Sequence, residues 1–102
     1  MDGDDLNEDL IVQVVHNRAK HRFEAEVEGK MAVLDYIESP GRITFTHTFT
    51  PIGLRGRGIA SQVVHAGLEY ARVNNLAVVP QCWFVADYID GQPEYEALVH
   101  KG

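Results

Sequence analysis

The sequence is poor in cysteine and has no long apolar run. Its single cysteine, Cys82, cannot form a disulfide within the chain, which excludes a disulfide-stapled secreted fold and favours a reducing compartment. No segment approaches the about 20 consecutive apolar residues that a membrane helix needs. The first residues are acidic and lack the basic and apolar regions of a signal peptide. We therefore expect a cytoplasmic protein without a membrane partner.

Basic residues are also few. Nine Lys and Arg stand against 15 Asp and Glu, and the formal net charge is -6. No region has the basic excess of a nucleic-acid surface, so no nucleic-acid partner is expected. We interpret residues 1–9 as an acidic flexible tail and residues 10–102 as a single domain with one core. The tail contains no Lys or Arg, and its acidic residues are Asp2, Asp4, Asp5, Glu8 and Asp9.

Hydropathy patterns predict four strands, a long helix, a fifth strand and then one or two short helices. Ile43, Phe45, His47 and Phe49 alternate with threonines along the fourth strand, which has strong β character. Closely spaced strands favour an antiparallel meander, and the strand–helix–strand passage makes the fourth and fifth strands parallel neighbours. The expected strands are 10–17, 23–28, 31–37, 43–50 and 76–79, with Gly29-Lys30 and Ser39-Pro40-Gly41 as turns; the expected helices run from Ile59 to Asn74-Asn75, over 83–89 and over 93–100.

A run of alternating arginines and glycines, Arg55-Gly56-Arg57-Gly58, opens directly into the long helix. Glycines in such a turn let an anion approach the unpaired N–H groups of a helix N-terminus, and the helix dipole and the arginines favour negative charge. The turn therefore predicts a phosphate or pyrophosphate cradle. It lacks the Lys-Ser/Thr of a Walker A loop. It also lacks the third glycine and the later acidic residue of a dinucleotide fold, because Ser61 holds the third-glycine place. The pyrophosphate of coenzyme A is the remaining candidate ligand for the turn, and binding of another phosphate compound stays an open alternative.

At these residues the chain resembles the GNAT superfamily of acetyl-CoA-dependent N-acetyltransferases. Their motif, Gln/Arg-x-x-Gly-x-Gly/Ala at the start of a helix, is matched by Arg55, Gly58 and Ala60. The strand end at His47-Thr48 with Pro51, and the segments Cys82–Ile89 and Pro93-Glu94-Tyr95, are similar to very small single-domain members of about one hundred residues. The resemblance spans about residues 23–99. It implies an α+β (broadly α/β) fold: a mixed, mostly antiparallel five-stranded sheet with a long helix after strand four and short C-terminal helices.

The resemblance also implies a ligand pose. The fourth and fifth strands splay apart, the pantetheine arm lies between them, and the pyrophosphate meets backbone N–H groups at the glycine turn. Arginines there add positive charge, unless they are only solvated. The residues expected to bind acetyl-CoA are Phe49, Thr50, Leu54, Arg55, Gly56, Arg57, Gly58, Ile59 and Ala60.

The chain departs from the family where many members carry a glutamate base on strand four. Small relatives frequently have His-Thr-Glu there, whereas this sequence has His47-Thr48-Phe49. Three side chains are candidates to take over the chemistry. His47 would be a base, because imidazole titrates near neutrality; Tyr88 would protonate the leaving thiolate; Cys82 would line the site or accept the acyl group. Each also has a structural alternative, respectively a hydrogen-bonded strand histidine, a core aromatic residue and a small buried hydrophobic residue. Trp83, Phe84 and Tyr95 are assigned to packing or a pocket wall.

The leading hypothesis is an acetyl-CoA-binding protein that transfers an acetyl group to an amine. The acceptor site is expected to be open and shallow, because 18–22 leaves space only for a turn where larger relatives insert helices. An open site suits an amine on a protein or peptide. The alternative is a coenzyme-binding or protein-interaction module without catalysis, which the missing glutamate favours. The scattered histidines have no metal-ligand spacing, and no metal is predicted.

Overall fold

The computed structural model describes residues 11–100, so the predicted acidic tail lies outside the described residues. Five strands form one sheet in the order β1-β2-β3-β4-β5. The first three pairings are antiparallel, and β4 and β5 are parallel. The predicted fold class is confirmed. The elements are β1 (Val15–Asn17), β2 (Arg22–Val27), β3 (Lys30–Ser39), β4 (Arg42–Phe49), the 3-10 helix η1 (Ile52–Leu54), α1 (Ile59–Val73), β5 (Ala77–Pro80), α2 (Trp83–Asp90) and α3 (Pro93–Glu96).

The first strand and the first hairpin turn differ from the prediction. β1 covers only Val15–Asn17, because the chain before it leaves the sheet and the Val12 N–H donates to Gln62 Oε1 of α1 at 3.0 Å. The β2–β3 turn lies at Glu28 and Gly29, one residue earlier than predicted. Both residues have positive φ, 54° and 77°, the conformation that two-residue hairpin loops favour.

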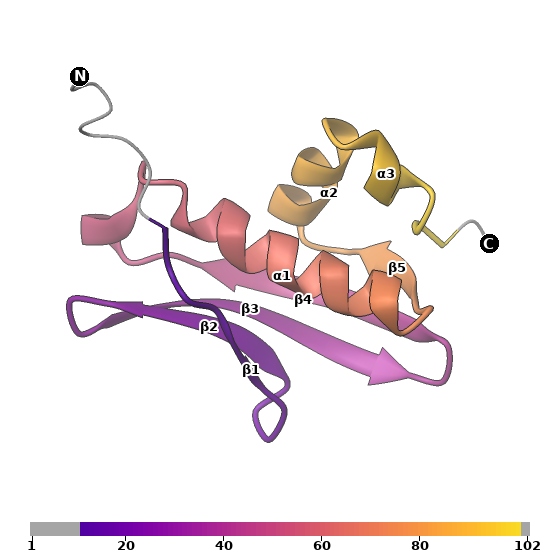
Figure 1. The fold of residues 1–102 in the computed structure, drawn as a ribbon, viewed down its shortest axis with the longest axis horizontal. Helices are drawn as coiled ribbons and strands as arrows, with labels where there is room; N and C mark the ends of the chain where they lie inside the picture. The colour runs from indigo at the N-terminus through magenta and orange to yellow at the C-terminus, as the bar shows by residue number, and fades with distance from the viewer. Residues whose placement is uncertain (1–10, 101–102) are drawn as a thin grey trace.

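The core lies between the sheet and α1. The apolar stripe of α1 is buried against β2, β3 and β4, and all three helices lie on this one side of the sheet (Figure 1). Helix and sheet are in close contact at Gly67. A Cβ there would lie 2.8 Å from Leu34 Cδ2 and 3.0 Å from Phe45 Cε1, so only glycine allows this spacing without rearrangement.

A β-bulge in β4 breaks the alternation read from the sequence. Asp35 pairs with His47 and Tyr36 pairs with Phe45, so Thr46 is the extra residue of the bulge. The bulge reverses the facing of every later side chain in the strand. Phe45 is therefore buried towards α1, whereas His47 is exposed. Ile43, Phe45, His47 and Phe49 do not share one face.

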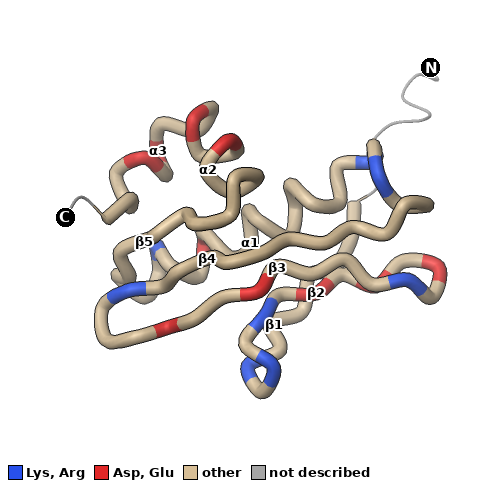
Figure 2. Tube along the Cα trace, turned by 180° about the vertical axis from the view of Figure 1, so that it is seen from behind, with Lys and Arg blue, Asp and Glu red and all other residues tan. Residues whose placement is uncertain are grey.

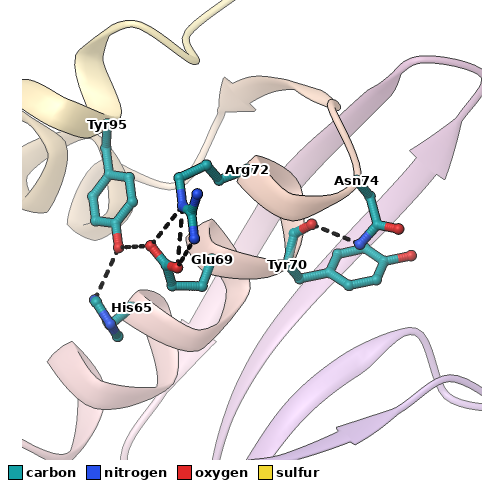
Figure 3. Close-up of polar contacts among 6 residues, drawn as sticks. All are labelled: His65, Glu69, Tyr70, Arg72, Asn74 and Tyr95. Atoms are coloured by element: carbon teal, nitrogen blue, oxygen red, sulfur yellow. Dashed lines mark hydrogen bonds and ion pairs between the residues drawn. The ribbon is translucent and has the colours of Figure 1, made fainter.

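The C-terminal segment completes the free edge of β5. The last helix ends at Glu96 and does not continue to His100 as predicted, because the Val78 N–H donates to the Leu98 carbonyl and the His100 N–H donates to the Val78 carbonyl. A polar network joins α3 to α1 (Figure 3): the Tyr95 hydroxyl contacts Glu69 and His65, and Arg72 donates to Glu69. Among residues 11–100, no helix is both long and apolar enough to cross a membrane.

Candidate coenzyme site

The glycine turn places the N-terminus of α1 at the open end of the sheet. Gly56 and Gly58 have φ of 80° and 74°, which L-residues with side chains rarely adopt. Gly58 is the N-cap of α1, and no side chain caps the first turn of this helix. Arg55 Nε donates to the Thr50 carbonyl at 2.8 Å and holds the turn against the end of β4. Backbone N–H groups of the first helical turn are thus left for an outside acceptor such as an anion.

The sheet opens beside this turn. Pairing between β4 and β5 runs only from Arg42 with Ala77 to Phe45 with Pro80. The Cys82 N–H donates to the Phe45 carbonyl at 3.0 Å, and from there the chain turns away into α2. In the described part of the chain, no strand pairs with the β5 side of β4 after Phe45. The backbone at Thr48 already contributes a hydrogen bond to the Cys82 thiol, and the other backbone groups on this side of the strand end have no strand partner and can meet an extended ligand.

A pocket of about 460 Å³ occupies this opening, within the range of small-molecule sites. It runs from the glycine turn, between the end of β4 and the start of α2. The walls combine threonine hydroxyls, backbone of the turn and aromatic side chains. Trp83, with 75% of its surface exposed, lies at the pocket rim. The lining residues are Thr48, Thr50, Leu54, Arg55, Gly56, Gly58, Ile59, Ala60, Ser61, Trp83 and Phe84.

Cys82 lies next to this pocket as the N-cap of α2. Its thiol is buried, and Sγ lies 3.6 Å from Thr48 Oγ1. Burial raises the pKa of this thiol, but hydrogen bonds from the Thr48 hydroxyl and from the backbone at Val85, Phe84 and Thr48 outweigh it, and the net pKa lies below the ordinary value. A thiolate at a helix N-terminus is the reactive form of cysteine.

The structure brings together seven of the nine predicted coenzyme residues and separates the other two. Arg57 points towards the β2–β3 turn, where Nη1 lies 3.7 Å from Glu28 Oε2, and it does not line the pocket. Phe49 is on the far face of the sheet, opposite Val33. The seven that line the pocket are Thr50, Leu54, Arg55, Gly56, Gly58, Ile59 and Ala60.

The three predicted catalytic residues do not form one cluster. His47 faces away from the pocket, and its Nδ1 lies 3.4 Å from Asp35 Oδ2. Tyr88 lines a separate groove of about 370 Å³ on the other side of the α1 N-terminus, together with Gln62 and His65. Burial, with Glu94 and Glu69 nearby, raises the pKa of Tyr88. None of the three lines the pocket itself; Cys82 comes nearest, through its contact with the lining residue Thr48 and as the chain neighbour of Trp83.

Two pocket residues were missed by sequence reasoning. Thr48 follows the β4 bulge, and only the pairing of β3 with β4 shows that it faces the pocket. Ser61, which holds the third-glycine place in the sequence, also lines the pocket, and its position next to the glycine motif is a usable signal. Of Trp83, Phe84 and Tyr95, which the sequence assigns to packing or a pocket wall, the first two line this pocket and Tyr95 is buried in the core. Within residues 11–100, no three His, Cys, Asp or Glu side chains converge in a metal-binding arrangement.

Comparison with known proteins defines the class. The family described as GCN5-related N-acetyl-transferase matches residues 22–98, and the chain belongs to this family. Among its relatives are proteins called NATD1. The one from Gallus gallus is 32% identical over 98 residues, covering 93% of this chain and 89% of that protein. The one from Homo sapiens is 31% identical over 91 residues, covering 86% and 80%.

A solved structure shares the fold. The NMR structure of a GCN5-like protein from Staphylococcus aureus superposes with a TM-score of 0.64 at 21% identity, covering 89% of this chain and 90% of that one. At this identity the likeness concerns the fold alone.

Proposed function

We propose that this protein binds acetyl-CoA in the pocket at the glycine turn and transfers the acetyl group to an amine. The observation that carries the proposal is the coincidence of two features at one place: the uncapped N-terminus of α1 behind two positive-φ glycines, and the end of β4–β5 pairing at Phe45. The first suits a pyrophosphate. The second gives an amide-bearing arm a strand edge to pair with. Family membership agrees with this ligand.

The chemistry follows from what surrounds the opening. The acyl group at the end of the pantetheine arm would lie near Thr48 and Cys82, whose side chains are in contact. Backbone N–H groups of β4 on the side that β5 leaves unpaired after Phe45 are the candidate donors for the oxygen that gains negative charge during acyl transfer. Holding coenzyme and amine together supplies a large part of the rate.

Cys82 offers a covalent variant of the same reaction. The thiolate would attack the thioester carbonyl, the new S–C bond would form as the bond to the coenzyme sulfur breaks, and the coenzyme thiolate would take up a proton from water. The amine would then displace Cys82. The lowered pKa of Cys82 and its place beside the pocket support this step.

A coenzyme-binding module without turnover is the second candidate. Phe49 holds the position of the family glutamate, and its side chain is 48% exposed on the far face of the sheet, where it supplies neither a base nor a pocket wall. On this alternative the chain binds acetyl-CoA and the acetyl group remains on the coenzyme.

The test combines calorimetry with a coenzyme-release assay. Binding of acetyl-CoA is measured by isothermal titration, and release of free coenzyme is followed with a panel of primary amines and lysine peptides. Catalysis predicts binding together with amine-dependent release, and the module predicts binding alone. No heat at millimolar acetyl-CoA contradicts both candidates.

Two variants refine the site within the same assay. Cys82→Ala removes the thiol, and Tyr88→Phe removes the hydroxyl in the neighbouring groove. A covalent route through Cys82 requires that Cys82→Ala lose turnover while keeping acetyl-CoA binding. Full turnover in both variants would show that neither side chain takes part.

A further inference from the structure

The sheet has one face that no described helix covers. The helices α1, α2 and α3 all lie on the other side (Figure 1), and the figure turned by 180° shows the same arrangement from behind (Figure 2). The uncovered face follows from the strand registers and from the residues buried towards α1. We call it the open face. Its side chains on the three longest strands are Arg22, Glu24, Glu26, Met31, Val33, Asp35, Ile37, Ser39, Arg42, Thr44, His47 and Phe49.

A carboxylate–imidazole pair lies in the middle of the open face. Asp35 on β3 and His47 on β4 are directly opposite in the register, with Nδ1 3.4 Å from Oδ2. Arg22 of β2 is opposite Asp35 on its other side, but its guanidinium is engaged with Glu24 at 2.7 Å. Because β5 ends its pairing at Phe45, no described strand lies beyond His47 in this row. Asp35 is therefore the one charged group directly opposite His47.

The pair lies at the edge of the sheet opening. Thr48, the next residue, points to the other face and contacts Cys82 at 3.6 Å. Adjacent strand residues point to opposite faces, so His47 and Thr48 flank the same unpaired edge of β4. An acyl group held in the opening would have Thr48 and Cys82 on the coenzyme side and His47 on the open face.

The surroundings of the pair suit a cation on an apolar stem. Val33 and Phe49 are directly opposite each other, two residues along each strand from Asp35 and His47 on the same face. Phe49 is 48% exposed. Opposite side chains in antiparallel strands lie about 5 Å apart at Cβ, which makes a short apolar surface leading to Asp35. On these three strands the open face carries three carboxylates and two guanidiniums: Glu24, Glu26 and Asp35 against Arg22 and Arg42, the latter at the far end of β4. Figure 2 colours the acidic positions along the tube red.

We propose that the open face receives the acceptor, a lysine side chain of a polypeptide, and that His47, positioned by Asp35, is the base for its amine. The inference rests on the proposed function and adds the acceptor's side of the reaction. The lysine methylenes lie along Val33 and Phe49. The ammonium loses one proton to solvent on binding at His47, and the neutral nitrogen attacks the thioester carbonyl. The N–C bond forms, the C–S bond breaks, His47 takes the second nitrogen proton, and the coenzyme thiolate is protonated by water.

A binding experiment tests the docking half without turnover. The probe is a blocked Gly-Lys-Gly peptide, titrated into labelled protein saturated with coenzyme A, which carries no acetyl group. We expect amide and side-chain shifts at Val33, Asp35, His47 and Phe49, and their loss in Asp35→Asn. Asp90→Asn is the matched control, because it removes an exposed carboxylate at the end of α2. Shifts confined to other residues, or equal shifts in Asp35→Asn, overturn the docking assignment.

A kinetic experiment tests the chemical half. Loss of a general base typically lowers rates by about 10²-fold or more, so His47→Gln is expected to lower kcat on the peptide at least about 100-fold while the KM for acetyl-CoA stays the same. Asp35→Asn should lower kcat about tenfold, and Asp35→Glu should restore part of it, which a merely structural carboxylate would not do. Both side chains are exposed, so the variants should fold, and their melting temperatures check this.

The outcomes separate this inference from the proposed function. Absence of acetyl-CoA binding in the parent chain contradicts the proposed function itself. Binding and turnover that survive in His47→Gln leave the proposed function standing and overturn the base assignment. Binding of both coenzyme and peptide without any turnover also overturns it, since the base then has no reaction to serve.

Discussion

Replacing Gly56 by Ala tests the anion cradle against a matched glycine elsewhere in the chain. Gly56 has φ 80°, and Gly41, in the β3–β4 turn at the other end of the sheet, has φ 74°. A Cβ at either position meets nothing within 4 Å. The two substitutions therefore impose the same backbone strain and no collision within the chain, but only Gly56 lines the pocket.

The expected loss of stability is equal for both variants. Holding an L-residue in the left-handed region costs about 1–2 kcal/mol, and the smaller conformational entropy of unfolded alanine offsets about half a kcal/mol of that. A net loss of about 1 kcal/mol lowers the melting temperature of a domain of this size by about 4–8 °C. Thermal unfolding of Gly56→Ala and Gly41→Ala measures this directly.

The expected loss of coenzyme affinity is confined to Gly56→Ala. A methyl group on the pocket wall would keep a pyrophosphate away from N–H groups of the turn, and a hydrogen bond to a charged group contributes about 1.5–3 kcal/mol. Loss of one such bond weakens binding by about tenfold or more, and calorimetry with acetyl-CoA measures it. Unchanged affinity in Gly56→Ala, or equal weakening in both variants, would refute the cradle.

Three further expectations concern the thiol, the polar network and the core. Because its pKa is lowered, the Cys82 thiol should react with iodoacetamide near neutral pH. Thr48→Val removes a hydrogen bond to the sulfur and should slow this reaction, and an unchanged rate would contradict the role of that hydrogen bond. Hydrogen bonds from Arg72 and Tyr95 lower the pKa of Glu69 to about 2. The stability that the ionised carboxylate contributes is therefore complete above its unfolded pKa near 4.5 and is lost as pH falls towards 2. In Glu69→Gln the melting temperature should fall less steeply over that pH range, and a pH profile parallel to that of the parent would contradict this. Truncating a fully buried α1 side chain, Leu68→Ala, should cost about 2–5 kcal/mol in urea unfolding, and a loss below 1 kcal/mol would show that the helix is not packed as described.

The fold could be predicted from the sequence because its signals are local. The apolar stripe after Ile59 and the stop at Asn74 define α1, and the strand–helix–strand passage fixes β5 as the parallel neighbour of β4. The C-terminal end was harder to predict. A helical pattern continues after Pro93, but the free edge of β5 binds the backbone at Leu98 and His100 and ends the helix early.

The candidate site was predicted in part, and its errors have physical causes. The glycine turn is a local motif, and most of its residues line the pocket. The bulge at Thr46 depends on pairing with β3, which no pattern within β4 reveals, so the sequence alone does not show that Phe45 and His47 lie on opposite faces of the sheet. The Arg57 guanidinium lies near the Glu28 carboxylate instead of in the pocket, and Glu28 is distant in sequence, so sequence patterns near the glycine turn do not reveal this contact.

Tyr88 illustrates a limit of spacing arguments. Cys82 is the N-cap of α2, and Tyr88 lies near the end of the same helix. The two residues are six positions apart, which is about 1.7 helical turns and about 9 Å along the axis. Their side chains therefore leave the helix at different heights and in different directions. Only the packing of α2 against α1 shows which groove each one lines.

The most direct test of the account is an NMR titration of the labelled chain with acetyl-CoA. Binding in the sheet opening predicts saturable shifts of the backbone amides from Thr46 to Thr50, from Gly56 to Ser61 and around Cys82, with little change in the β1–β2 hairpin. A lack of shifts at millimolar acetyl-CoA, or shifts confined to other parts of the chain, would contradict the central claim that the glycine turn and the open end of the sheet form the coenzyme site.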